Sequence, residues 1–280
     1  MDKLKKPIHP HRNSPSLSPR KWIIAFVVCN FNVDLGPEIE LVYPPDVHFS
    51  TSDLSAICFN SFPERHDTEM HEDLCFQFSI HNGSPDIRLD SPCPPYGSPS
   101  ELYGHCIFRQ EYDHNTKRAF SQKSLVLISN HDFPAFYLDT LQKLTRSGLI
   151  SDPNALEAAC SQISSWPAPS VGKHELPFMG SLLMLEIAPH AGFPLQGLPS
   201  LGLINGEKRP SHIYAYEPVG NWAKLIPYMP SLSELYILFE KLLLCESTVV
   251  LAKSPQLCFE FVSAAKDLIR PVPYAGIVRP

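Results

Sequence analysis

Apolar and polar positions alternate through the first half of the chain in a way that is typical of an antiparallel sheet. A continuous apolar run at 22–30 is followed at once by an alternating stretch at 38–43. Further runs of the same kind make the predicted strands 22–30, 38–43, 74–80, 86–89, 101–113 and 118–129. Because only a short charged loop separates 101–113 from 118–129, these two are predicted to form a hairpin.

Apolar residues at helical spacing predict three helices in the same half, at 52–62, 133–148 and 154–166. Ser52 or Asp53 is the expected N-cap of the first. Gly148 is expected to end the second, and Asp152 with Pro153 to open the third. This order of elements indicates an antiparallel sheet with helices packed against it.

The turn between the first two strands, DLGP at 34–37, is the tightest corner in the pattern. Gly36 is expected to adopt a positive φ there. Ile39 and Val42, or Leu41 if the register slips, are predicted to pack inward. The acidic residues of this strand are predicted to face solvent or a partner: Glu38 and Glu40.

After the third helix the pattern changes. A proline-rich linker is predicted at 166–177, with one strand at 180–189 and irregular chain through 190–230. Trp166 and the prolines after it are predicted to form a rigid spacer anchored by a buried indole, rather than a proline-rich ligand.

The last fifty residues read as helix, strand and helix. Ser231 and Glu234 have capping-box spacing, so a helix is expected over 230–246. The β-branched run at 247–253 predicts a strand buried on both faces. Ser254 and Pro255 are expected to open a helix over 254–271. A strand is predicted at 274–278, and two strands leave an α/β sheet incomplete, so the sequence is expected to be cut short at its C-terminus.

The composition narrows the classes of function. A net charge of −6 over 280 residues argues against nucleic-acid binding, which calls for a clustered basic face. Since no apolar run reaches 18 residues, no membrane span is expected. The 8 cysteines lie mostly within apolar runs and none forms a C-x-x-C pair, which favours buried, reduced thiols.

Two charged clusters invite a functional interpretation. The segment HDTEMHED at 66–73 could suggest a metal site, but its spacing is not that of a metal-binding motif, and we expect a solvated acidic loop. Lys117, Arg118 and Lys123 could form a basic patch on the predicted hairpin, although a solvated strand face is the simpler interpretation. The chain contains neither a phosphate-binding loop nor a G-x-S-x-G nucleophile motif.

Several longer strings resemble the DENN-domain proteins, and among these the class-six branch, the FAM116 family. They are CNFNVDLGPEIELVYP (29–44), AICFNSFPE (56–64), YGHCIFRQ (103–110), FSQKSLVLIS (120–129), LEAACSQISSWPAP (156–169) and LPFMG (176–180). The resemblance covers 22–180 and continues loosely through 225–280, whereas 190–220 matches nothing in the family pattern.

The resemblance implies a bilobed α/β protein: a basic disordered tail at 1–20, an α+β longin-like lobe at 21–166, a linker with one strand at 167–225, and the start of an α/β DENN lobe at 226–280. It also implies a guanine-nucleotide exchange factor for a Rab-type GTPase, cytoplasmic and peripheral on endosomes or vesicles. The GTPase would dock against both lobes, with no catalytic residue, cofactor or metal. A non-catalytic longin-type adaptor is the alternative.

No residue of the matching strings marks a contact site, because these strings are mostly core. Ligands of open α/β sheets bind outside the carboxyl ends of the strands. In the second lobe this rule indicates Lys253, Ser254 and Pro255, which follow the predicted buried strand. The alternative is that Ser254 only caps a helix.

Overall fold

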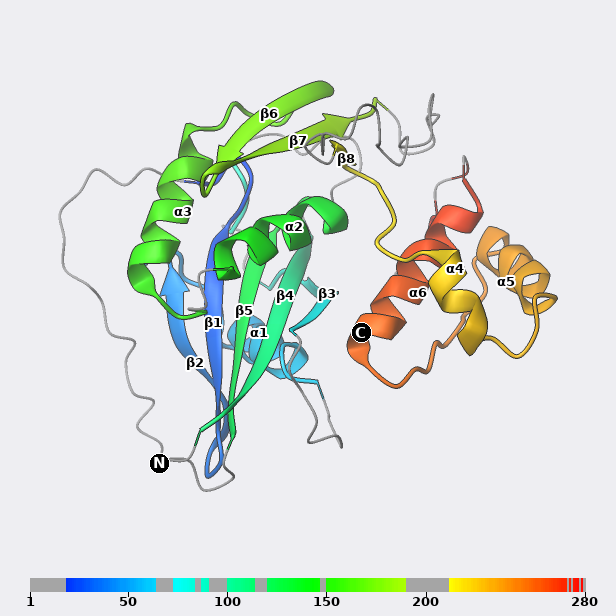
Figure 1. Cartoon of the computed structure of the whole chain (residues 1–280), viewed down its shortest axis with the longest axis horizontal. Helices are drawn as coiled ribbons and strands as arrows, with labels where there is room; N and C mark the ends of the chain where they lie inside the picture. Colours follow the sequence, from blue (N-terminus) through cyan, green and yellow to red (C-terminus); the bar gives the residue numbers. More distant parts are fainter. Residues whose placement is uncertain are drawn as a thin grey trace, which may run out of the picture.

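The protein consists of a sheet lobe and a smaller helical lobe, which lie side by side (Figure 1). This computed structural model describes residues 19–63, 73–83, 87–90, 100–113, 120–146, 150–189, 212–270, 272, 274–276 and 278. The mixed α and β fold that the sequence predicts is confirmed. Of the predicted tail at 1–20, residues 1–18 lie outside the described residues, as do 190–211 of the segment 190–230 that was predicted to be irregular.

The sheet lobe is built on five antiparallel strands in the order β2-β1-β5-β4-β3. Their bounds are β1 Ala25–Asn32, β2 Gly36–Tyr43, β3 Leu74–His81, β4 Glu101–Tyr112 and β5 Phe120–Ser129. The predicted hairpin is β4–β5. Residues 87–89, for which a strand was predicted, form none.

The first corner is as predicted, since Gly36 has a φ of 86°, where a side chain would be strained. The pairing of β1 with β2 then shifts: Val28 lies opposite Leu41, but Cys29 lies opposite Ile39. Such a bulge inserts one residue and reverses the alternation of faces beyond it. Ile39 and Val42 therefore pack on one face of the sheet, and Leu41 on the other.

Helices cover both faces of this sheet. The helix α1 (Thr51–Asn60) packs on one face, while α2 (Pro134–Thr145) and α3 (Pro153–Ser165) cover the other. Asp152 caps α3 as predicted. The cap of α1 is Ser50, whose hydroxyl accepts from the Asp53 amide at 3.1 Å, so the prediction of Ser52 or Asp53 is wrong.

The segment predicted to be a linker with one strand contains a small sheet. Its strands are β6 (Gly172–Phe178), β7 (Ser181–Ile187) and β8 (His212–Tyr214), in the order β6-β7-β8. The apolar side chains of this sheet extend the core formed by α2 and α3. The sequence indicated only β7, because β6 contains a proline and β8 is three residues long.

Trp166 anchors this segment, as predicted. Its indole is buried, and Nε1 donates to the Pro177 carbonyl at 2.8 Å. Trp22 packs edge-on against the Trp166 ring and donates from its own Nε1 to the Pro167 carbonyl at 2.7 Å. The proline-rich stretch is therefore held against the start of β1, where a partner domain has no access to its main chain at these points.

The helical lobe comprises α4 (Trp222–Leu225), a 3-10 turn (Ile226–Tyr228), α5 (Glu234–Leu243) and α6 (Pro255–Leu268). Ser254 caps α6 as predicted. For α5 the N-cap is Ser233, and no side chain caps it, so the predicted capping box is not formed. None of the described helices has the length and apolar character needed to cross a membrane.

The two strands predicted for this lobe are absent from its described residues. Residues 247–253 have no regular structure, and Val249 and Leu251 are 82% and 90% exposed. Residues 274–276 and 278 are also irregular. A β-branched run forms a strand only when another strand supplies the hydrogen bonds of its ladder, and no described segment pairs with either stretch.

Candidate functional site at the junction of the lobes

The two lobes meet where α6 lies against β3, the edge strand of the five-stranded sheet (Figure 1). An edge strand presents unpaired amide and carbonyl groups. Gln256, in the first turn of α6, satisfies one of them, because its side-chain oxygen accepts from the Cys75 amide at 3.2 Å. Phe259, one turn further along α6, packs against the core between α1 and the sheet. The contact is therefore partly apolar and partly a matched polar pairing.

The residues predicted as a binding site lie directly before this contact. Ser254 accepts from the Leu257 amide at 3.2 Å and is the N-cap of α6, and Pro255 is its first residue. Lys253 is exposed. The argument that placed them at the carboxyl end of a buried strand is wrong, because an irregular segment precedes them. Their position next to Gln256 nevertheless brings them to the junction, and their role in binding stays a prediction.

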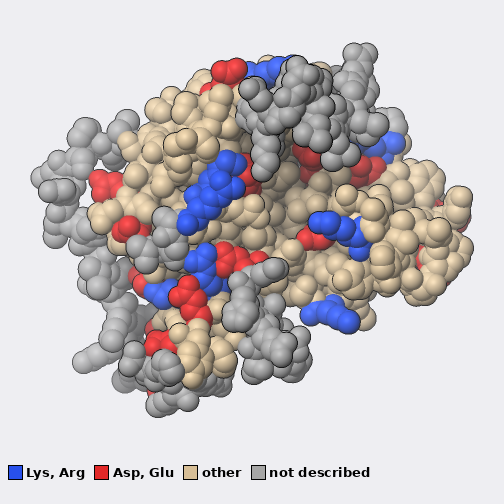
Figure 2. All heavy atoms as spheres, viewed as in Figure 1, with Lys and Arg blue, Asp and Glu red and all other residues tan. Residues whose placement is uncertain are grey.

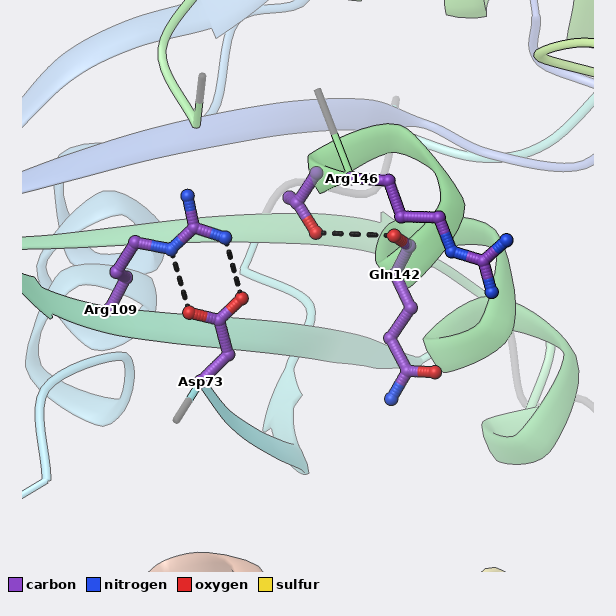
Figure 3. Close-up of a pocket in the computed structure, with 5 residues that line it drawn as sticks. Asp73, Arg109, Gln142 and Arg146 are labelled. Atoms are coloured by element: carbon purple, nitrogen blue, oxygen red, sulfur yellow. Dashed lines mark hydrogen bonds and ion pairs between the residues drawn. The ribbon is translucent and has the colours of Figure 1, made fainter. Parts of the chain in front are cut away.

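A shallow pocket of about 320 Å³ lies on the sheet-lobe side, lined by Asp73, Arg109, Gln142, Thr145 and Arg146 (Figure 3). Asp73 immediately precedes β3, and Arg109 lies on the neighbouring strand β4. Gln142, on α2, has its amide nitrogen 3.5 Å from the sulfur of Cys75. The amide of that same cysteine contacts Gln256, so the pocket and the start of α6 border the same end of β3.

The electrostatics of this pocket do not favour a tightly bound anion. Arg109 donates from two nitrogens to both carboxylate oxygens of Asp73, at 2.7 Å each, a bidentate geometry that neutralises the guanidinium. The Arg146 side chain points away from this pair (Figure 3). It also follows the C-terminus of α2, where the helix dipole is negative. The pocket is better suited to polar contacts with a protein surface.

Charged side chains on the face seen in Figure 2 are spread over both lobes, with basic and acidic groups next to one another. Of the predicted basic patch, Lys117 and Arg118 lie outside the described residues. Lys123 is paired with Glu40 at 2.8 Å, and it is not a free cation on a strand face.

A charged pair that the sequence did not single out, Asp132 and Lys266, spans the junction. Asp132, between β5 and α2, accepts from Gln77 Nε2 on β3 at 2.8 Å and from Lys266 Nζ on α6 at 3.2 Å. Burial alone would raise the pKa of Asp132, but Lys266 and the Gln77 hydrogen bond hold it below its ordinary value. The carboxylate is therefore ionised and paired across the junction.

No sequence signal singled out these residues. The sequence places 55 positions between Gln77 and Asp132, and 134 between Asp132 and Lys266. The local pattern predicts only a strand around Gln77, a loop around Asp132 and a helix around Lys266. The motif that did attract attention, HDTEMHED, lies outside the described residues except for Asp73. Within the described part of the chain, no three His, Cys, Asp or Glu side chains are grouped so that they could hold a metal ion.

The cysteines support the interpretation as reduced thiols for the residues described. All seven are free, and Cys29, Cys58, Cys106 and Cys160 are buried. Burial raises the pKa of Cys160, as it does that of Cys106, so both thiols stay protonated. Cys245 is exposed, contrary to the prediction, and Cys93 lies outside the described residues.

No protein-family model matches the chain. Individual proteins do. The chain is 30% identical over 270 residues to Protein DENND6A of Gallus gallus and 29% identical over 270 residues to Protein DENND6B of Homo sapiens; each match covers 92% of this chain and 46% of the relative. Protein DENND6 homolog of Dictyostelium discoideum is 26% identical over 292 residues, 93% of this chain and 39% of the relative.

The chain thus spans less than half the length of the curated relatives that it matches. Within that span the match covers 92% of this chain, so it includes part of the second lobe, where none of the strings quoted above lies. The resemblance drawn from sequence is confirmed: over 92% of its length the chain is a homologue of the DENND6 proteins, the class-six branch of the DENN-domain proteins.

Proposed function

We propose that the chain is part of a guanine-nucleotide exchange factor that acts on a Rab-type GTPase on endosomes or vesicles. The observation that carries this proposal is the similarity to DENND6 proteins along 92% of the chain, since DENN-domain proteins are in general exchange factors for Rab GTPases. The GTPase would contact both lobes across their junction, with Lys253–Pro255 on one side and the pocket around Arg109 and Arg146 on the other.

Nucleotide exchange needs no acid–base group. An exchange factor accelerates GDP release by binding the nucleotide-free GTPase more tightly than the GDP-bound form. What the exchange factor must supply is a surface of fixed shape that remodels the switch regions. The junction offers such a surface, because Gln256 and Asp132 set where α6 lies on the sheet.

Release of fluorescent GDP from a panel of purified Rab proteins tests the proposal. We expect one or a few Rabs to release nucleotide faster in the presence of the chain. Lys253→Glu is expected to reduce that acceleration, because it reverses an exposed charge beside α6 without touching the core. Lys173→Glu is the matched control on the exposed face of β6, away from the junction. Acceleration of none of the Rab proteins by the chain would contradict the proposal.

A non-catalytic adaptor is the second candidate. It would bind its partner through the sheet lobe alone. An adaptor would retain a GTPase or another trafficking partner in a pull-down and leave GDP release unchanged. The two measurements on the same preparation therefore separate the candidates.

A further inference from the structure

Asp132 is the point at which three segments of the chain converge. It follows β5 and precedes α2, and its two carboxylate oxygens face different partners. Oδ1 accepts from Gln77 on the edge strand β3 at 2.8 Å, and Oδ2 accepts from Lys266 near the end of α6 at 3.2 Å. One carboxylate thus connects the sheet, the start of α2 and the helical lobe.

Lys266 is the cation that pairs with this carboxylate, because the nearby His105 is neutral. His105 lies directly opposite Gln77 in the pairing of β3 with β4. Desolvation lowers the pKa of His105 to about 3, so this neighbour is neutral at physiological pH. Side-chain exposure is 21% for Asp132 and 38% for Lys266. Removing Lys266 would therefore leave a partly buried charge with one neutral hydrogen bond, whereas removing the carboxylate would leave a lysine that can turn into solvent.

Polar contacts hold α6 against the sheet lobe at both of its ends. Gln256 holds the first turn, through the Cys75 amide, and Phe259 adds apolar contact in the second. Lys266 lies on the last turn, at the other end of the helix. Just beyond α6, the Arg270 guanidinium donates to the Tyr216 carbonyl at 3.0 Å, and Ser79 on β3 donates to the Val278 carbonyl at 2.8 Å. Among these contacts Asp132–Lys266 is the ion pair, and it constrains the direction of the last turn of α6 on the edge strand.

We propose that Asp132, through Lys266, is a positioning residue that holds the helical lobe in one orientation against the sheet lobe. Resting on the proposed function, the inference extends to the GTPase: the orientation presents Lys253–Pro255 and the Arg109 pocket as one preformed surface. Asp132 itself makes no contact with the partner.

Hydrogen exchange of the backbone amides of α6, measured by mass spectrometry on the whole chain, tests the first part without any GTPase. Lys266→Met is expected to speed exchange at 255–268 by about tenfold, and to leave exchange in β1 and β5 unchanged. Asp132→Asn keeps the shape and is expected to have a smaller effect. The double variant should resemble Asp132→Asn alone, because the buried charge is then gone.

Lys241→Met is the matched control. It breaks the exposed Lys241–Glu246 pair, 2.8 Å apart on α5 and the residues that follow it, and should leave exchange in α6 unchanged. The proposal is overturned if Lys266→Met leaves α6 unchanged, if the control has the same effect, if exchange rises equally throughout the sheet, or if the effects of the two junction variants simply add.

The second part is read from nucleotide release with a responding Rab. Lys266→Met is expected to raise the concentration of this chain that gives half-maximal acceleration and to leave the maximal rate near that of the unmodified chain. Lys266→Arg, which keeps the cation, should restore the lower concentration. A fall in the maximal rate alone would overturn this part. If no Rab responds, the proposed function fails. The hydrogen-exchange measurements on α6 would still test whether Asp132 and Lys266 hold the helical lobe in one orientation.

Discussion

His105 is a histidine enclosed between the sheet and α2, and its packing requires the neutral ring. It is wholly buried, and its ring centroid lies 4.7 Å from that of Tyr137. Desolvation lowers its pKa to about 3, against a smaller opposing effect of Asp132. His131, stacked on Phe133, behaves in the same way, with a pKa lowered to about 4 by burial. The sequence singled out neither ring: His105 lies within the predicted strand 101–113, and His131 lies between the predicted strand 118–129 and the predicted helix 133–148.

These histidines predict a loss of stability in mild acid. In the unfolded chain a histidine binds a proton below about pH 6.5, while folded His105 does not. The unfolded state therefore gains protons first, and the free energy of unfolding falls as the pH falls from about 6.5 towards 3. Between pH 7 and pH 5, His105 alone should account for roughly 2 kcal/mol of this loss.

Replacement of the ring by an apolar one of similar shape isolates the effect. His105→Phe should lose less stability than the unmodified chain between pH 7 and pH 5, with the remaining loss due to His131 and other groups. Urea unfolding curves at pH 7 and pH 5 measure the change in the free energy of unfolding for each protein. Any cost of packing the phenylalanine ring is the same at the two pH values and therefore cancels from this change. An equal loss in the two proteins would mean that folded His105 titrates normally.

At the scale of single elements, the termini of helices follow local chemistry closely. Asp152 and Ser254 each cap a helix that has proline in its first turn, and both caps were expected from the sequence. Ser50 caps α1 two residues before the predicted range 52–62, because either of two polar residues further along could have begun the same apolar spacing. Helix boundaries of this kind are uncertain by a residue or two, even when the helix itself is correctly predicted.

Ser254 allows its two interpretations, cap and contact residue, to be separated. Ser254→Ala should destabilise the first turn of α6 by about 1 kcal/mol, and Ser254→Asp should restore it, since both serine and aspartate accept from the third helical amide. Hydrogen exchange at 257–260 is the measurement. Asp152→Ala in α3 is the matched control and should cost a similar amount. An alanine variant whose first turn exchanges at the unmodified rate would contradict the role as a cap.

The edge strand β3 shows what an element gains from the rest of the molecule. Its apolar positions Leu74, Phe76, Phe78 and Ile80 alternate inward, as the sequence predicts. Two other features of β3 depend on residues far along the chain. Phe78 lies opposite Gly104 on β4, where a Cβ would come within 2.5 Å of the Phe78 ring, and α6 packs against the strand. The alternation of apolar and polar residues predicts the strand. Its pairing with β4 alone, and not its own sequence, makes β3 an edge strand of the sheet.

At the scale of the whole molecule, the helical lobe has an unusually apolar surface. Along α5, Leu238 and Leu242 are buried, whereas Tyr236 and Leu243 are exposed. Val249 and Leu251, which follow the helix, are exposed as well. Exposed apolar side chains of this kind promote association when they gather in one patch. Their apolar sequence is the reason that the pattern of this lobe predicts a buried strand.

The two interpretations of 247–253 predict different costs of substitution. If the stretch is exposed, as in the structure, Val249→Ser with Leu251→Ser should change the free energy of unfolding by no more than about 0.5 kcal/mol per residue. The same double variant should also scatter less light at high concentration. Val27→Ser, in the fully buried strand β1, is the control and should cost several times more, about 2 kcal/mol or above. A comparable cost at Val249 and Leu251 would favour a buried strand.

The sequence by itself determined the five strands of the large sheet, the three helices packed on it, the first corner, and the helix caps Asp152 and Ser254. Periodicity, the positive φ of Gly36 and the capping by Asp152 depend on residues within a few positions of one another. Only the tertiary structure decided the bulge after Val28, the small sheet of β6, β7 and β8, and the attachment of α6 through Asp132. These features depend on which distant segment supplies the hydrogen-bond partner or the counter-charge, and a local pattern of apolar and polar residues carries no record of that choice.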